Sequence, residues 1–90
     1  MSPRLQDSID SLVCSYPWPC GEALSVMRCE SGRDPGAYSN GNYGLFQINA
    51  VHAWRVGGDL SQLFEPEVNV RVAYEIWLDN AGWRPWACKP

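Results

Sequence analysis

The sequence predicts a mostly α-helical domain with a small hairpin or extended insertion, and three observations lead to this fold class. The chain has 90 residues, enough for one compact domain that we expect to span residues 1–90. Apolar residues recur at intervals of three and four in three segments, which is the spacing of one helix face. Between the second and third segments lies a stretch rich in glycine and asparagine, which is typical of turns.

Two helices are predicted at the beginning of the chain. Over residues 4–13, four aliphatic side chains lie at helical spacing and indicate an amphipathic helix. Pro17 and Pro19 then interrupt helical structure and predict a turn. A second helix is expected over about 21–31, because apolar residues form a stripe among strong helix formers.

The middle of the chain is expected to form turns and short elements. The sequence Ser-Asn-Gly-Asn at 39–42 contains Asn-Gly, the strongest short hairpin signal. The following segment, 43–49, is compatible with a short strand or an extended segment. Short helical pieces are expected over 50–54 and 60–64, with a Gly-Gly loop between them.

The longest helix is predicted over residues 66–81. Apolar side chains repeat there at three and four, Pro66 suits the first helical position, and Gly82 suits the helix end. The tail that follows must fold back toward the domain if Cys88 forms a disulfide.

Charge and hydropathy exclude two classes of partner. The net charge is −3 from ten acidic and seven basic residues, without a run of Lys or Arg, so we expect no nucleic-acid partner. No apolar run approaches the ~18–20 residues that a bilayer span needs, so we expect no membrane span. The first residues also lack the apolar centre of a secretory signal, so export would need a signal already removed or another route.

The four cysteines predict two disulfides. They stand at positions 14, 20, 29 and 88 and allow three connectivities. Zinc sites usually show CxxC or CxxH pairs, whereas the gaps here are six, nine and fifty-nine, so we expect neither a metal nor another cofactor. Disulfides persist in oxidising compartments, and we therefore expect a secreted, periplasmic or cell-wall-associated protein.

The chain is also rich in large aromatic residues, with five tryptophans and four tyrosines. Such residues fill the core of a small domain, or they form a carbohydrate groove in which flat rings cover the faces of sugars. Composition leaves both interpretations open.

Glu30 is the candidate catalytic residue. It stands near the C-terminal end of the second predicted helix, directly before a break rich in glycine and proline. The negative end of the helix dipole disfavours the charged form of a carboxylate there, and burial among aromatic side chains would act in the same direction. A carboxylic acid kept protonated is the proton donor that glycosidic cleavage requires. The simpler alternative is a solvated glutamate at a helix end.

The residues around Glu30 resemble the lysozyme-like superfamily, whose bacterial members include lytic transglycosylases and resuscitation-promoting factors. Cys-Glu-Ser-Gly at 29–32 is similar to the place where a glutamate, often followed by serine, ends one helix. Asn-Tyr-Gly-Leu-Phe-Gln-Ile-Asn at 42–49 resembles the Gly-Leu-Met/Phe-Gln-Ile stretch that forms the opposite wall of the groove.

Two further segments resemble the same superfamily. Residues 63–70 are similar to the segment that opens the third helix of transglycosylase domains, and residues 82–88 resemble the C-terminal end of resuscitation-promoting factors. The resemblance covers about residues 20–88 and implies an α+β lysozyme-like fold. In resuscitation-promoting factors a C-terminal cysteine pairs with the one directly before the catalytic glutamate. This implies a Cys29–Cys88 disulfide, which we favour together with Cys14–Cys20.

The resemblance implies that Glu30 is the general acid and base and that its neighbours bind a glycan. Gln47 and Asn49 offer amide groups to N-acetyl or hydroxyl groups, although either is also suited to satisfying the backbone. Gly44 would leave room for the close approach of a sugar. The other candidates for substrate binding are Ser31, Tyr43, Phe46 and Tyr74. A helix-capping role is the alternative for the serine, and core packing is the alternative for the last tyrosine.

One position departs from the animal-type lysozymes. Their second carboxylate, the nucleophile, directly precedes the Tyr-Gly of this motif, whereas this chain has the neutral Asn42, which cannot form a glycosyl ester. A substrate-assisted route remains, in which the 2-acetamido group of the sugar stabilises the cationic centre. We expect His52, the only histidine, at the groove edge or in a structural role rather than in catalysis.

The predicted function is cleavage of the β-1,4 bond between N-acetylmuramic acid and N-acetylglucosamine in peptidoglycan. The enzyme would be a lytic transglycosylase, which forms a 1,6-anhydro product, or a lysozyme-type muramidase, which hydrolyses the bond. Peptidoglycan glycan strands would be the partner of a monomeric chain. The competing interpretation is a binding module for peptidoglycan or chitin oligomers with weak or lost catalysis, and a third is an inhibitor or interaction domain with a tryptophan-rich surface.

Overall fold

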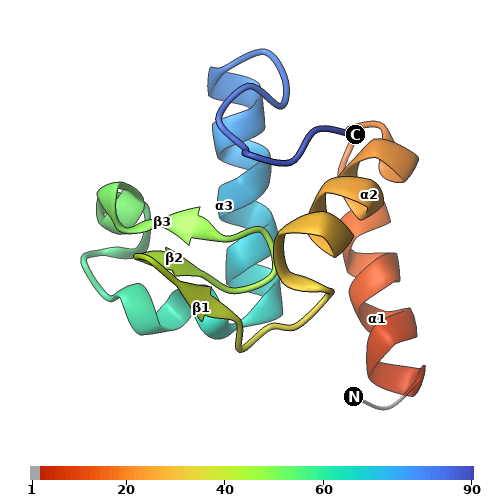
Figure 1. Cartoon of the computed structure of the whole chain (residues 1–90), viewed down its shortest axis with the longest axis horizontal. Helices are drawn as coiled ribbons and strands as arrows, with labels where there is room; N and C mark the ends of the chain where they lie inside the picture. Colours follow the sequence, from red (N-terminus) through yellow and green to blue (C-terminus); the bar gives the residue numbers. More distant parts are fainter. Residues whose placement is uncertain (1–2) are drawn as a thin grey trace.

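The fold is described by a computed structural model that covers residues 3–90. Within these residues it contains three α-helices, two 3-10 helices and one three-stranded antiparallel sheet (Figure 1). In chain order the elements are α1 (Pro3–Cys14), α2 (Cys20–Ser31), β1 (Tyr38–Ser39), β2 (Asn42–Tyr43), β3 (Ile48–Asn49), η1 (Ala50–Val56), η2 (Leu60–Phe64) and α3 (Pro66–Asp79). The predicted fold class, a mostly helical domain with a small hairpin-like insertion and two disulfides, is confirmed.

The predicted helices agree with the observed ones to within two residues. Among the α-helices the largest difference is at the end of α3, which stops at Asp79 rather than at Ala81. The Asn80 side chain donates a hydrogen bond to the Ile76 carbonyl (2.8 Å), and Ala81 takes a positive φ of 51°. The chain therefore leaves the helix before the glycine that the sequence indicated as its end.

The Asn-Gly signal marks the turn between β1 and β2, as predicted. Tyr38 pairs with Tyr43, and Ser39 pairs with Asn42, which leaves the two residues 40–41 as the connection. Both take positive φ values, 51° and 79°, which is the conformation that a tight two-residue hairpin requires.

The segment 43–49 is two short strands joined by a turn rather than one strand. Tyr43 pairs with Ile48 across this turn. Gly44 and Gln47 have φ values of 73° and 51°, and the Gln47 N–H donates to the Gly44 carbonyl (3.1 Å). These positive φ values reverse the chain where the apolar sequence indicated extended structure.

Asn69 on α3 holds this turn in place. Its side chain is fully buried, accepts a hydrogen bond from the Phe46 N–H (2.9 Å), and donates to the carbonyls of Tyr43 and Leu63 (2.8 Å each). A Cβ atom on Gly44 would lie 2.3 Å from the Leu63 carbonyl oxygen and 2.4 Å from Asn69 Nδ2. Position 44 therefore requires glycine because the Leu63 carbonyl and the Asn69 side chain lie against it, and not because a sugar approaches there as expected.

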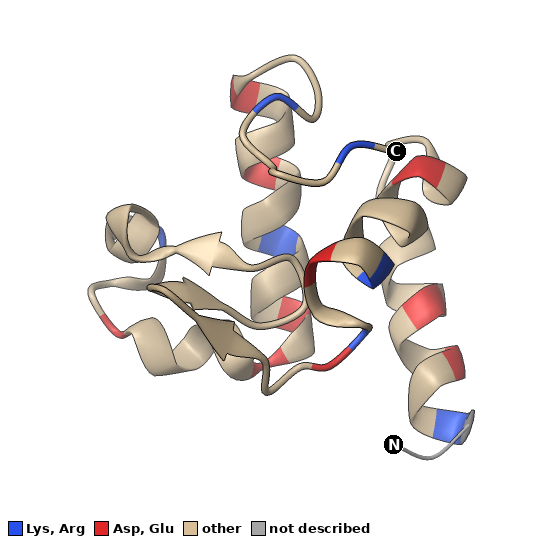
Figure 2. Cartoon of the chain, viewed as in Figure 1, with Lys and Arg blue, Asp and Glu red and all other residues tan. Residues whose placement is uncertain are grey.

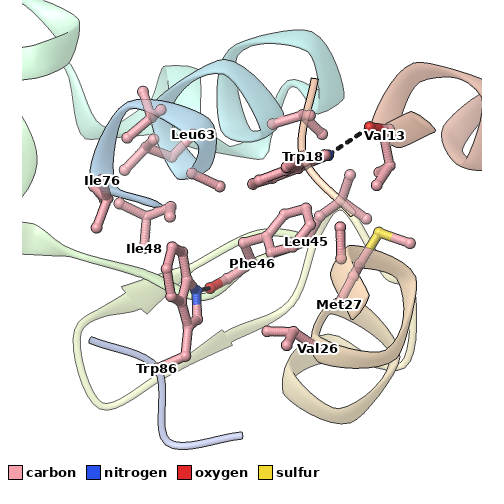
Figure 3. Packing of buried hydrophobic residues seen from close by; sticks show 14 of the residues in the cluster. Val13, Trp18, Val26, Met27, Leu45, Phe46, Ile48, Leu63, Ile76 and Trp86 are labelled. Atoms are coloured by element: carbon pink, nitrogen blue, oxygen red, sulfur yellow. Dashed lines mark hydrogen bonds between the residues drawn. The ribbon is translucent and has the colours of Figure 1, made fainter. Parts of the chain in front are cut away.

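Most of the tryptophans belong to the core. Trp18, Trp83 and Trp86 are buried in it, Trp77 packs against it, and Trp54 is 70% exposed. Figure 3 shows two of the buried indoles using their N–H groups: that of Trp18 donates to the Val13 carbonyl (2.8 Å), and that of Trp86 donates to the Phe46 carbonyl (2.9 Å). The core-filling interpretation thus accounts for most of the tryptophans.

Both expected disulfides are present. Cys14–Cys20 joins the end of α1 to the start of α2, and Cys29–Cys88 joins the last turn of α2 to the C-terminal segment. The four cysteines are thereby all paired.

Charged residues are dispersed over the fold. Figure 2 shows Lys and Arg scattered along the chain, with two of them on the C-terminal segment, and Asp and Glu spread over the helices and loops. No helix among residues 3–90 has the length and apolar character needed to cross a membrane.

Candidate active site

A groove of about 380 Å³ opens beside the C-terminal end of α2. It is bordered by α2, the β2–β3 hairpin, the start of η1, α3 and the C-terminal segment. The lining residues are Glu30, Asn42, Gln47, Ile48, Asn49, Val51, His52, Ile76, Pro85, Trp86 and Ala87. Of the sequence-predicted site residues, the structure brings together Glu30, Gln47 and Asn49 in this groove.

Glu30 stands in the last turn of α2. The helix ends directly after it because Gly32 takes the left-handed conformation and donates its N–H to the Arg28 carbonyl (2.9 Å). Glu30 Oε2 accepts a hydrogen bond from the Cys88 N–H (2.9 Å), and Cys88 is bonded through its sulfur to Cys29. The disulfide and this hydrogen bond together fix the carboxyl group. Glu30 Oε1 has no hydrogen-bond partner among the described residues and is available to a ligand.

Gln47 lies on the wall formed by the hairpin, and its amide group is largely occupied within the protein. Nε2 donates to the carbonyls of Ala37 (3.2 Å) and Gly44 (3.0 Å), and Oε1 accepts from the Ser39 hydroxyl (3.0 Å). Because both amide hydrogens are used, this side chain has only an acceptor lone pair to offer a ligand.

Asn49 and Asn42 lie beside each other on the same wall. Asn49 Oδ1 accepts from the Val51 N–H (3.0 Å) and so caps η1, while its Nδ2 donates to Asn42 Oδ1 (3.1 Å). The Nδ2 group of Asn42 has no protein partner within residues 3–90. Asn42 therefore presents unused amide donors to the groove at the position where animal-type lysozymes have a carboxylate.

Three other predicted site residues do not line the groove. Ser31 donates its hydroxyl to the Met27 carbonyl (3.2 Å) within the same helix. Gly44 and Phe46 are buried, and Phe46 forms part of the core behind the hairpin.

The two predicted tyrosines also lie outside the lining. The ring of Tyr43 packs between those of Tyr38 and Phe64, at centroid distances of 5.0 and 5.5 Å. The ring of Tyr74 packs on those of Tyr16 (5.1 Å) and Trp77 (5.9 Å). Tyr74 is thus part of an aromatic cluster that does not line the groove.

His52 on η1 is a groove residue that the sequence did not single out for chemistry. Its Nδ1 accepts a hydrogen bond from Arg55 Nε (3.2 Å). Burial lowers the pKa of His52 below that of a free histidine, and the neighbouring Arg55 guanidinium lowers it further, while the Asp79 carboxylate acts in the opposite direction. The only sequence feature that could have indicated His52 as a groove residue is its position three residues after the Gln-Ile-Asn stretch.

The groove chemistry is that of one carboxyl group opposite several neutral polar groups. Among residues 3–90 no three His, Cys, Asp or Glu side chains are grouped so that they could hold a metal ion. A carboxyl group with one anchored and one open oxygen can give a proton to a bound oxygen atom and take one back.

Comparison with known proteins agrees with this geometry. The model of the lysozyme-like domain family matches residues 21–88, a span that contains Glu30, the hairpin wall and the Cys88 anchor. Searches of curated proteins and of solved structures gave no significant match. Since the family match covers most of the chain, the protein belongs to the lysozyme-like domain family.

Proposed function

We propose that this protein cleaves the β-1,4 bond between N-acetylmuramic acid and N-acetylglucosamine in peptidoglycan, with Glu30 as general acid and base. Membership of the lysozyme-like family indicates a glycoside-cleaving activity on peptidoglycan. The observation that carries the finer proposal is the Glu30 carboxyl group, anchored through Oε2 and open at Oε1 in a groove of sugar size.

In the acid form, the anchor favours a proton on the other oxygen. The carbonyl oxygen of a protonated carboxyl group is a better acceptor than its hydroxyl oxygen, so with Oε2 accepting from the Cys88 N–H the proposed acidic proton is on Oε1. When Oε1 gives this proton to the departing sugar oxygen, the Cys88 N–H stabilises the carboxylate that remains. The same hydrogen bond thus serves both the acid and the base form of Glu30.

The neutral Asn42 favours a substrate-assisted reaction. Glu30 protonates the glycosidic oxygen, the bond from that oxygen to the anomeric carbon breaks, and the acetamido oxygen of the muramoyl unit bonds to this carbon. Glu30, now a carboxylate, takes a proton from the 6-hydroxyl of the same sugar or from water. The resulting oxygen nucleophile displaces the acetamido group. The first nucleophile gives a 1,6-anhydro end and the second a reducing end.

The test is the variant Glu30→Gln, which retains an acceptor for the Cys88 N–H but has no acidic proton. We expect unchanged thermal unfolding and no release of soluble fragments from purified cell walls. Glu67→Gln, in the exposed first turn of α3, is the matched control and should retain activity. Release of fragments by Glu30→Gln at the rate of the unmodified protein would refute the proposal.

Mass spectrometry of the released fragments distinguishes the two enzymatic outcomes. Fragments lighter by one water molecule identify a lytic transglycosylase, and fragments with reducing ends identify a muramidase. Retention of the unmodified protein on insoluble peptidoglycan without any soluble product would instead favour the binding-module function.

The disulfides and the proposed substrate indicate where the protein acts. The two disulfides are consistent with an extracellular protein. We propose that the protein acts at the cell wall, outside the reducing cytoplasm, where its glycan substrate lies.

A further inference from the structure

His52 lines the same groove as Glu30, and one of its two ring nitrogens accepts a hydrogen bond from another residue of the protein. Arg55 Nε donates to His52 Nδ1 at 3.2 Å. In a neutral imidazole one nitrogen accepts and the other donates, so the proton of His52 is on Nε2. No protein group within residues 3–90 accepts a hydrogen bond from this Nε2–H.

The donor to Nδ1 is itself held firmly. The Arg55 side chain is only 8% exposed, with Nη2 bonded to Asp79 (2.6 Å) and Nη1 bonded to Glu75 (3.3 Å). The exposed ring of Trp54 covers the guanidinium at 4.4 Å. Because a guanidinium is always protonated, Arg55 cannot accept a proton from the ring and always presents a donor to Nδ1.

The charges around His52 also favour its neutral form. Protonation at Nδ1 would place an imidazolium against the Arg55 guanidinium and break their hydrogen bond. The Asp79 carboxylate from α3 offsets this effect only in part, because it is already paired with Arg55. Glu75 from α3 is also paired with Arg55, and Glu30 from α2 is the one acid among residues 3–90 that lines the groove. The pKa of His52 is lowered accordingly.

Few donors of the groove wall remain free for a ligand. Both amide hydrogens of Gln47 are used inside the hairpin, and Asn49 gives one of its two to Asn42. The second Nδ2 hydrogen of Asn49, the Nε2–H of His52 and the Nδ2 group of Asn42 remain. Oxygen atoms of an N-acetylated sugar are acceptors that such donors can bind.

We propose that His52 is a substrate-binding residue that donates a hydrogen bond from Nε2 to a carbonyl or hydroxyl oxygen of the bound glycan. It does not act as the second base, because its lone pair is on Nδ1 and is covered by Arg55. Arg55 is then a positioning residue that sets the tautomer of His52. This inference rests on the proposed glycan-cleaving function of the groove.

The tautomer can be tested without any substrate. Nitrogen-15 NMR of the intact protein near neutral pH should show a protonated Nε2 and an unprotonated Nδ1 for the single histidine. In Arg55→Met the two tautomers should become mixed and the pKa of His52 should rise. A proton on Nδ1 in the unmodified protein would overturn the inference.

Binding is tested in the Glu30→Gln background, where turnover does not complicate the measurement. The probe is a tetramer of N-acetylglucosamine, titrated by calorimetry. His52→Leu removes the donor and should weaken binding by about 3- to 10-fold, the range for loss of one hydrogen bond. His52→Gln places an amide donor near the former Nε2 and should bind within about 2-fold of the His52 protein. Equal binding by the leucine and histidine forms would refute the inference.

Turnover separates a donor from a base. With Glu30 intact, a base role predicts that both His52 variants lose at least about 100-fold in kcat. The donor role predicts a raised KM for His52→Leu and near-normal kinetics for His52→Gln. If the unmodified protein binds the tetramer in a His52-dependent way but releases no wall fragments, the proposed function fails while this inference stands. Absence of tetramer binding by the Glu30→Gln protein would overturn the inference, and release of wall fragments by the unmodified protein would then show that the proposed function survives.

Discussion

The two disulfides should contribute very differently to stability and to activity. Cys29–Cys88 closes a loop with a sequence separation of 59, whereas Cys14–Cys20 has a separation of only 6. The loop-entropy relation gives about 4 kcal/mol for the first and about 2 kcal/mol for the second. Replacing both cysteines of each pair by serine should therefore lower the free energy of unfolding by about 4 and about 2 kcal/mol.

The longer disulfide should also matter to catalysis. The backbone N–H of Cys88 holds Glu30 Oε2, and the bond to Cys29 holds Cys88 against the end of α2. Without that bond the C-terminal segment gains freedom, and the carboxyl group loses its anchor in part of the population. The short disulfide, by contrast, joins α1 to α2 and contributes no residue to the groove lining.

Both effects are measurable on the two double-serine variants. Urea unfolding monitored by tryptophan fluorescence gives the free energies, and fragment release from cell walls gives the activity per folded molecule. Activity should be measured at a temperature where both variants are fully folded, since 4 kcal/mol is a large part of the ~5–15 kcal/mol of a typical domain. Equal stability losses, or full activity of the folded C29S/C88S variant, would refute this reasoning.

Three further predictions concern Asn69, Gly44 and His52. Asn69→Leu removes a hydrogen-bond partner from two buried backbone groups and one part-buried one, and should lower the free energy of unfolding by about 3–5 kcal/mol in urea titrations; a loss under 1 kcal/mol would contradict the role of Asn69 in holding the turn. Gly44→Ala combines a positive φ with a Cβ clash and should cost at least about 3 kcal/mol, whereas Gly41→Ala, with a similar φ and open space, should cost less. Because the folded protein lowers the pKa of His52, the unfolded state binds more protons below pH about 6.5. Stability should therefore fall from pH 7 to pH 5 more steeply in the unmodified protein than in His52→Gln, and parallel pH curves would contradict this.

Local chemistry made the helices and the first hairpin predictable. A two-residue hairpin turn requires positive φ values, which asparagine and glycine adopt more readily than other residues. The Asn-Gly pair therefore locates the turn between β1 and β2 from the sequence alone. Pro66 likewise stands at the first position of α3, where its missing N–H is harmless. Glu30 could be proposed as the catalytic residue because the residues around it are contiguous in sequence and resemble a known family.

The site residues that sequence reasoning could not place depend on contacts distant in the chain. Gln47 resembles a ligand-binding amide until its partners, the carbonyls of Ala37 and Gly44, are known. Phe46 and Tyr74 have no sequence feature that separates a groove ring from a core ring, because the choice is made by packing between elements. Asn69 is a polar residue among apolar ones, and its three hydrogen bonds connect segments up to 26 residues apart.

The C-terminal segment explains how so short a chain can keep a groove of fixed width. The Cys88 N–H holds Glu30 on one wall. The Trp86 indole N–H, shown in Figure 3, holds the Phe46 carbonyl behind the other. One donor is a backbone N–H and the other is the buried indole of the residue two positions earlier, so one short segment contacts both walls. The disulfide attaches this segment to α2 covalently. In this small domain, a disulfide and two hydrogen bonds thus add to the core packing that holds the acid and the amide wall in place.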